Sequence, residues 1–205
     1  YIDLNTSGNR AKLGYDSNNL YIGSTSGTGA LYFKNNISST DAPHSSGDTK
    51  MIISDNAVTK PNQPCFHAYP SASSTTINTN SGQWERLPFN TTAWDVGSNF
   101  STSNERFTAP VTGMYLMNWM FQIENANTVV WMYAYPIVNG SQANNRSKGV
   151  IFSDFRVFEN YHTESGSWIM KLSANDYVEM HSVMSAGANT KNFKEESFWS
   201  GYLLG

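Results

Sequence analysis

The sequence predicts an all-β protein, in which an antiparallel β-sandwich or jelly roll follows a segment of very short strands. Apolar and aromatic residues recur in short runs that are separated by clusters of Ser, Thr, Asn and Gly, a pattern typical of strands and turns. No segment keeps the 3.6-residue periodicity of an amphipathic helix. Asn139 and Gly140 follow an apolar run, and this dipeptide predicts a hairpin because both central residues of the favoured turn need positive φ.

The composition limits the classes of partner. Of the 205 residues, 14% are charged and 39% are hydrophobic, and the formal net charge is −3. Disordered polyelectrolytes lack aromatic residues, and coiled coils need far more Ala, Glu, Lys, Leu and Arg. A chain without a basic patch does not suit nucleic acid. The longest apolar run, residues 129–138, is about half as long as a membrane span, so we expect no membrane insertion.

Residues 1–60 contain only short β-like pieces, at positions 1–4, 20–22, 30–33 and 51–54. Such short strands with few apolar residues are hard to stabilise in one chain, because isolated hairpins are marginal in water. Burial against the same segment of neighbouring chains would stabilise them. We therefore expect a fibre-like, intertwined segment, and the alternative is a flexible linker. Because the chain opens at Tyr1 without an initiator methionine, we expect it to be a piece of a longer protein.

Residues 61–205 form the predicted core domain, and Pro61 and Pro64 mark its start. Residues 114–123 predict a strand that is buried on both faces. Residues 128–138 place aromatic side chains on one face and smaller apolar side chains on the other. Further strands are predicted at residues 149–158, 167–172, 177–183 and 198–204. Cys65 is the single cysteine, and we expect it to be a small buried apolar side chain.

Residues 107–115, FTAPVTGMY, resemble the signature of the C1q-like globular head, a family that shares its trimeric jelly roll with tumour-necrosis-factor-like ligands. Three other stretches are similar to family motifs and occur in the right order. They are VGSNF at residues 96–100, LSANDYV at 172–178 and WSGYLL at 199–204. With the opening strand at residues 60–69, the resemblance covers residues from about 60 to 205 and implies a C1q/TNF-like jelly roll.

The chain departs from this family in two places. No collagen Gly-x-y repeat precedes the head, and Asn175 stands where the family often has Gly before Asp. In place of collagen, residues 1–4, 12–16 and 47–55 look like the repetitive shafts of bacteriophage tail fibres. The two resemblances together imply the distal end of a phage fibre, with a shaft at residues 1–60 and a head at residues 61–205.

The family resemblance implies that three copies pack around a three-fold axis. Aromatic side chains are candidates for either the core between the sheets or the trimer seam: Trp131, Tyr133, Tyr135, Tyr115 and Tyr202. Some family members hold calcium, but calcium needs several clustered oxygens. No such set can be mapped onto Asp154, Glu159 or Asp176, so the metal is left open and no cofactor is expected.

Enzymatic motifs are not found in the sequence. The four histidines have no metal-ligand spacing, and no Gly-x-Ser-x-Gly elbow or phosphate-binding loop occurs. Glu195 and Glu196, or Glu159 with Glu164, could in principle form a glycosidase pair, but solvated surface carboxylates are the simpler interpretation. We therefore expect a protein that is not an enzyme.

The resulting hypothesis is a trimeric receptor-binding tip of a phage fibre or virion spike, which is extracellular and is joined to upstream fibre or capsid proteins. It would attach the virion to a host-cell surface glycan or protein through several weak sites acting together. Candidate receptor contacts lie in two predicted loops: Asn144, Asn145 and Arg146 in one, Tyr161 and His162 in the other. The alternative is a structural trimerisation or capsid decoration domain that contacts no receptor.

Overall fold

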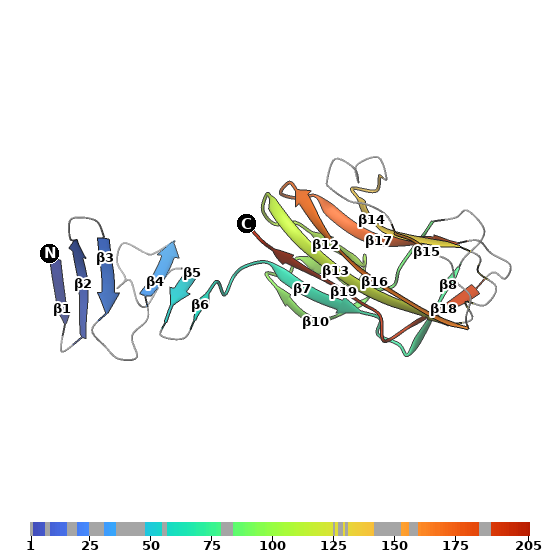
Figure 1. The fold of residues 1–205 in the computed structure, drawn as a ribbon, viewed down its shortest axis with the longest axis horizontal. Coiled ribbons are helices and arrows are strands. Elements are labelled where there is room, and N and C mark those ends of the chain that lie inside the picture. The colour runs from blue at the N-terminus through green and yellow to red at the C-terminus, as the bar shows by residue number, and fades with distance from the viewer. Residues whose placement is uncertain are drawn as a thin grey trace. The chain divides into compact units, whose positions relative to one another are not determined.

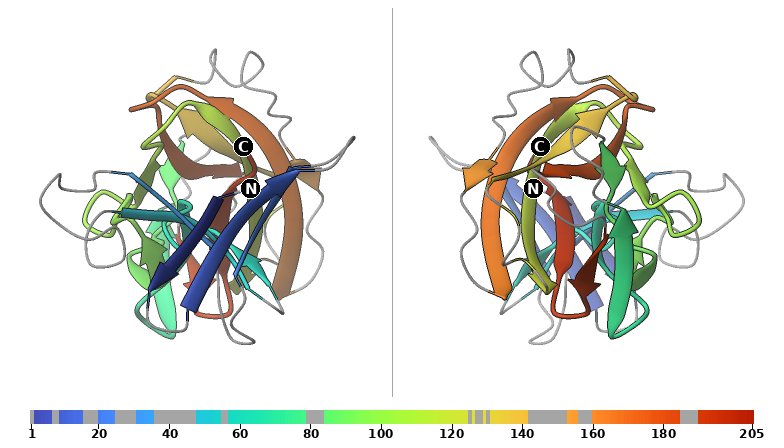
Figure 2. Two further views of the ribbon diagram at one scale, coloured as in Figure 1. Left: turned by 90° about the vertical axis from the view of Figure 1, so that its left-hand side faces the viewer. Right: turned by 90° about the vertical axis from the view of Figure 1, so that its right-hand side faces the viewer.

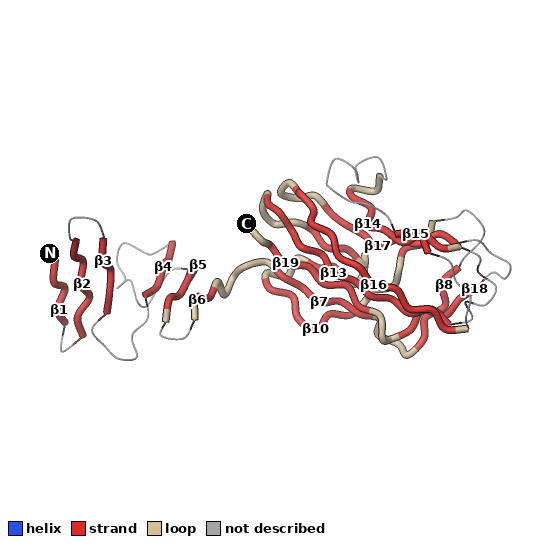
Figure 3. The backbone as a smooth tube through the Cα atoms, in the orientation of Figure 1, coloured by secondary structure: helices blue, strands red, loops and turns tan. Residues whose placement is uncertain are grey.

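A computed structural model describes residues 2–6, 9–15, 20–24, 31–35, 48–54, 57–78, 84–124, 126, 129, 131–141, 153–155, 160–184 and 190–205. The chain divides into two compact units, Tyr1–Gln63 and Pro64–Gly205. The regular elements of the described residues are strands (Figure 3), and this confirms the all-β prediction. No helix in the described residues is long and apolar enough to cross a membrane.

The first unit contains two small antiparallel sheets (Figure 1). The first sheet has the order β1 (Ile2–Thr6), β2 (Asn9–Tyr15), β3 (Leu20–Ser24). The second has the order β4 (Leu31–Asn35), β5 (Asp48–Ile53), β6 (Val58–Thr59). Four of these strands overlap the short β-like pieces of the sequence, whereas the sequence reading missed β2 and β6.

The second unit is a sandwich of two antiparallel sheets. In sheet I the order is β10 (Thr91–Val96), β7 (Cys65–Tyr69), β19 (Phe198–Leu203), β13 (Gly113–Glu124) and β16 (Tyr161–Leu172). Two further strands extend it: β18 (Thr190–Lys194) pairs with the end of β13, and β8 (Ser74–Asn78) pairs with β18.

Sheet II lies opposite sheet I (Figure 2). Its order is β11 (Phe100–Ser101), β12 (Arg106–Thr108), β17 (Tyr177–Met184), β14 (Met132–Val138) and β15 (Ser153–Phe155), and β9 (Glu85–Arg86) also pairs with β17. From β13 onward the chain crosses from sheet I to sheet II, back to sheet I at β16, to sheet II at β17 and back again. These crossings between sheets are the jelly-roll winding that the sequence predicted.

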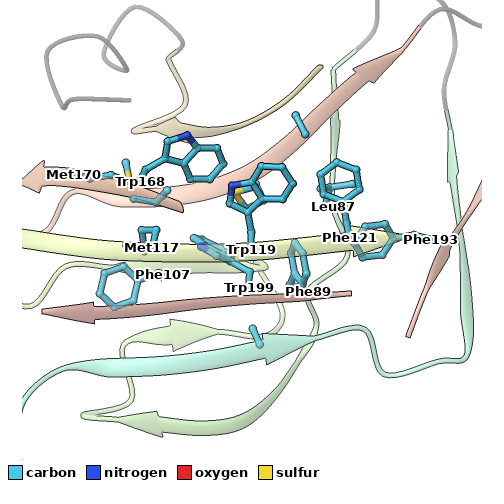
Figure 4. Packing of buried hydrophobic residues seen from close by; sticks show 14 of the residues in the cluster. Leu87, Phe89, Phe107, Met117, Trp119, Phe121, Trp168, Met170, Phe193 and Trp199 are labelled. Atoms are coloured by element: carbon cyan, nitrogen blue, oxygen red, sulfur yellow. The ribbon is translucent and has the colours of Figure 1, made fainter. Parts of the chain in front are cut away.

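Aromatic side chains from both sheets fill the space between them (Figure 4). Trp119 on β13 stacks on Phe121, with ring centroids 4.9 Å apart, and on Trp168 of β16, with centroids 5.2 Å apart. Phe66 on β7 stacks on Phe107 of β12 at 4.8 Å and meets Trp199 edge-on. The Phe66–Phe107 contact joins the two sheets, and the other rings bury large apolar areas on the inner face of sheet I.

Strand β13 corrects one prediction and β14 agrees with another. The inner face of β13 is fully buried, but its outer face is half-buried or exposed, because sheet II covers only one side of sheet I. In β14, Met132 and Ala134 point into the core while Tyr133 and Tyr135 lie on the outer face. The turn after β14 has φ values of 53° at Asn139 and 67° at Gly140, as the dipeptide predicts.

Gly201 lies on β19 where the strand passes close to two core side chains. A Cβ atom at this position would clash with Phe66 and would lie 2.7 Å from Met117 Sδ. Both neighbours are buried, so they have little room to move. Overpacking of this kind is expensive because the surrounding side chains must leave their preferred rotamers.

We predict that Gly201→Ala lowers the free energy of unfolding by about 1–3 kcal/mol, measured by urea denaturation followed by tryptophan fluorescence. Gly205→Ala is the matched control, because a Cβ there meets no atom within 4 Å and should leave the midpoint unchanged. Equal midpoints for Gly201→Ala and the unmodified chain would show that β19 does not pack as described.

Candidate functional site: the apolar outer face of sheet I

Exposed apolar side chains gather on the outer face of sheet I. Each is between 39% and 54% exposed, and together they define the apolar face: Trp94, Met114, Tyr161, Ile169, Tyr202 and Leu204. Among the described residues of the second unit, Val111 is the one large exposed hydrophobic residue outside this face. Successive side chains of a strand point to opposite faces, so this face alternates with the buried core positions of the same strands.

The strand register places an apolar row across this face, near the end where β13 begins. Leu116 on β13 pairs with Tyr202 on one side and with Ile169 on the other. Tyr202 in turn pairs with Cys65 on β7. The predicted burial of Cys65 in the core is wrong, because the side chain points outward and is half-buried. Partial burial raises the pKa of the Cys65 thiol, which favours the uncharged form.

Beside this row, three rings stack along the surface. His67 lies between Trp94, at 4.6 Å, and Phe198, at 5.2 Å, with interplanar angles of 25° and 20°. Burial between the two rings lowers the pKa of His67. The neutral imidazole is therefore favoured, and it adds to the apolar character of the face.

A polar cluster lies where β13 ends and β16 begins. The Tyr161 hydroxyl donates to Glu124 Oε1 at 2.6 Å, and Asn192 Nδ2 donates to Glu124 Oε2 at 3.2 Å. The hydrogen bond from Tyr161 is the largest cause that lowers the pKa of Glu124, and the same bond raises the pKa of Tyr161. Tyr161 therefore lies at the edge of the apolar face with its hydroxyl already engaged.

The predicted loop at Tyr161 and His162 is wrong, because both residues belong to β16. The strand pairs with β13 along its whole length, and this pairing overrides the polar sequence. His162 points to the opposite face from Tyr161, where its Nε2 lies 3.0 Å from Glu164 Oε1. The other three candidate receptor residues, Asn144, Asn145 and Arg146, lie outside the described residues.

The predicted aromatic candidates are distributed over different parts of the head. Tyr115 lies in the core between the sheets, where its hydroxyl donates to the Val111 carbonyl at 2.7 Å. Tyr135 is buried on the outer face of sheet II, and burial raises its pKa to about 12. Trp131 and Tyr133 are half-buried near it, with ring centroids 5.1 Å apart. Of these candidates, only Tyr202 belongs to the apolar face.

The outer face of sheet II carries a charged cluster that the sequence reading missed. Glu179 is 7% exposed. Its Oε1 lies 2.9 Å from Arg106 Nη2 and 3.3 Å from Arg86 Nη1, and its Oε2 lies 3.2 Å from His181 Nε2. Arg86 also pairs with Glu105, at 2.7 Å. The partners are far apart in sequence, so only the pairing of β9, β12 and β17 reveals the cluster.

No metal centre is found among the described residues, because no group of three His, Cys, Asp or Glu side chains is arranged to hold an ion. Asp176 is one of the three oxygen donors considered from the sequence. Its Oδ2 accepts from Ser173 N at 2.7 Å and its Oδ1 accepts from Asn139 Nδ2 at 2.7 Å. The Asp176 carboxylate is therefore occupied by hydrogen bonds within the β16–β17 turn and to Asn139.

The C1q domain model matches residues 69–204. The chain belongs to the C1q domain family. Similar solved structures include the globular domain of zebrafish complement 1qA (TM-score 0.49, 16% identity, 70% of this chain and 98% of that one). Another is murine APRIL at pH 8.0 (TM-score 0.48, 12% identity, 69% of this chain and 99% of that one). A third is Eiger TNF from S. frugiperda (TM-score 0.50, 12% identity, 70% of this chain and 94% of that one). No curated protein matches the sequence.

The backbone at position 175 accounts for the residue found there. Asn175 has a φ of 71°, in the left-handed region that glycine adopts most easily. Asn is one of the few other residues that adopts this conformation readily, because its short polar side chain can bond locally. The left-handed backbone at position 175 is therefore compatible with Asn in place of glycine.

We predict that thermal stability falls as the pH decreases from about 7 to about 5. Burial lowers the pKa values of His67 and His181, so the unfolded chain binds more protons in this range. This contribution to the free energy of unfolding is fully present above the ordinary pKa of histidine. It is lost as the pH falls below that value towards the lowered pKa of the folded chain. His67→Phe keeps a ring in the stack and should reduce the loss, measured as melting temperature against pH. Parallel profiles for the two proteins would contradict the role assigned to His67.

Proposed function

We propose that this chain is the distal end of a homotrimeric fibre or spike of a phage virion, whose C1q domain attaches the particle to a glycan or protein on the host-cell surface. In this proposal the head is extracellular and non-enzymatic, and upstream fibre or capsid proteins connect it to the virion. The single observation that carries the proposal is the apolar face of sheet I. In this proposal the apolar face is the surface through which three chains assemble. A trimer carries three copies of a weak binding site, and together they attach the particle more strongly than one site would.

The apolar face supports the trimer. Six large apolar side chains on one sheet face, flanked by the stacked rings of Trp94, His67 and Phe198, form a patch of the kind that marks protein interfaces. C1q and TNF-like domains form trimers. The outer face of sheet II instead carries the charged cluster around Glu179, and the large exposed apolar side chains of the sandwich gather on sheet I.

The first unit gives a second reason for assembly. Tyr32 and Phe33 are neighbours on β4 and point to opposite faces of a three-stranded sheet, yet both are exposed, as are Ile53 and Val58. A sheet this small cannot bury apolar side chains on both faces by itself. We infer that copies of this segment in the neighbouring chains cover them, as in an intertwined shaft.

Trimeric assembly would explain how such a head attaches strongly. Three identical weak sites on one particle act at high effective concentration, so their combined affinity exceeds that of each site by orders of magnitude. Asn144, Asn145, Arg146 and His162 remain proposed receptor contacts, whereas Tyr161 belongs to the apolar face that the trimer would cover. A structural role without a receptor, in trimerisation or capsid decoration, is the second outcome that the experiments below distinguish.

We predict that the chain is a trimer in solution, with a molar mass that is independent of concentration in light scattering. Ile169→Lys places a charge in the apolar row and should shift the mass towards that of one chain. Val111→Lys is the matched control, because Val111 is equally exposed but lies outside the apolar face. A monomeric unmodified chain, or trimers in both variants, would refute the assignment of this face.

Head exchange tests attachment. The labelled, unmodified chain should adsorb to at least one strain in a panel of bacteria. Replacing residues 64–205 with an unrelated trimerising domain should abolish this adsorption. Adsorption that survives the exchange would favour the structural role. If the unmodified trimer binds no strain in the panel, the attachment function is refuted for those hosts and the trimer assignment still stands.

A further inference from the structure

An open hollow of about 620 Å³ lies at the end of the sandwich where β13 begins. Three connections form its walls: the β10–β11 connection, the segment after β12 and the turn between β16 and β17. Its polar lining comes from Ser98, Asn99, Ser101, Thr108 and Asn175, and its apolar lining comes from Phe100, Ala109 and Pro110. A volume of this size is typical of sites for small molecules.

Hydrogen bonds fix the first wall. Asp95 Oδ1 accepts from Asn99 N at 3.0 Å, and Asp95 Oδ2 accepts from Phe100 N at 2.9 Å. Asn99 Nδ2 donates to the Val96 carbonyl at 3.1 Å. Thr108 N donates to the Asn99 carbonyl at 2.8 Å, which ties this wall to β12. The Asp95 carboxylate is thereby occupied by the loop.

The opposite wall is fixed in the same way. Asn175 N donates to the Ala109 carbonyl and Ala109 N donates to the Asp176 carbonyl, both at 2.8 Å. Two of the four non-glycine residues with positive φ in the described chain, Ser98 and Asn175, line the hollow. Such conformations persist only where the surrounding structure holds them, and they occur often at ligand sites. The hollow is therefore formed before any ligand binds.

The lining determines the chemistry of a ligand. None of its residues is charged, so the site offers nothing specific to a phosphate, a carboxylate or an amine. Hydroxyl and amide side chains both donate and accept hydrogen bonds. Within the described part of the chain, the side chains of Thr108 and Asn175 make no hydrogen bond, and the Pro110 ring offers an apolar surface beside them. Such a lining fits a neutral, hydroxyl-rich ring.

We propose that this hollow binds a neutral saccharide unit. The hydroxyl groups of the sugar hydrogen-bond to the Asn175 amide and the Thr108 hydroxyl, and its C–H face packs on Pro110. The lining residues all come from one chain and none of them belongs to the apolar face, so the site needs no second chain. The inference is thus independent of the trimer, and it adds a ligand site that is distinct from Tyr161 and His162.

Saturation-transfer NMR on the full chain tests the site, with the methyl glycosides of glucose, galactose and N-acetylglucosamine as probes. At least one probe should receive saturation from the unmodified chain. Asn175→Gly keeps the left-handed backbone and removes the amide, and Thr108→Val keeps the shape and removes the hydroxyl. Each should weaken binding by about five- to tenfold, as expected for one lost hydrogen bond.

Thr102→Val is the matched control, because Thr102 is exposed on the same domain and does not line the hollow. It should bind like the unmodified chain, and melting temperatures verify that all variants fold. The proposal is overturned if no probe binds the unmodified chain, or if the three variants bind equally well. If the unmodified chain adsorbs to cells but binds none of the glycosides, the proposed saccharide site is refuted and the proposed attachment function still stands.

Discussion

The structure depends on the burial of the aromatic inner face of β13. This strand runs through the middle of sheet I, and Tyr115, Met117, Trp119, Phe121 and Ile123 all point to the same side. Only a second sheet can remove that much apolar surface from water. The chain must therefore cross repeatedly between sheets. It must also keep small residues where rings pass close to the backbone, as at Gly166, where a Cβ would lie 2.8 Å from Trp119 Cζ2.

Covering one face of sheet I leaves the other face uncovered, and the two outer surfaces of the sandwich then differ. The apolar face on sheet I combines exposed aliphatic and aromatic groups with a histidine that burial keeps neutral. On sheet II, the buried Glu179 carboxylate is matched by Arg86 and Arg106. Breaking such a pair is costly because it leaves a buried charge without a partner. This asymmetry is the basis on which we propose self-association through sheet I.

The end of the sandwich where β13 begins is built differently from its faces. At the end where β13 begins, the connections are short and heavily hydrogen-bonded, and Ser98 and Asn175 hold left-handed conformations. Rigid connections on a rigid scaffold are suited to binding because little order is gained on ligand contact. In the two proposals made above, assembly uses a sheet face and recognition uses an end of the same domain.

The sequence by itself determined the all-β class, the alternation in residues 132–138 and the turn at Asn139 and Gly140, because these depend on local period and turn chemistry. Its four family-like stretches were enough to indicate the C1q domain. The sequence could not show that residues 161–166 continue β16, since pairing with β13 decides this against a polar composition. It likewise could not place Cys65 and Tyr202 side by side, gather the charges around Glu179, or form the hollow. Each of these requires residues far apart in the chain, and only the register of the folded sheets brings them together.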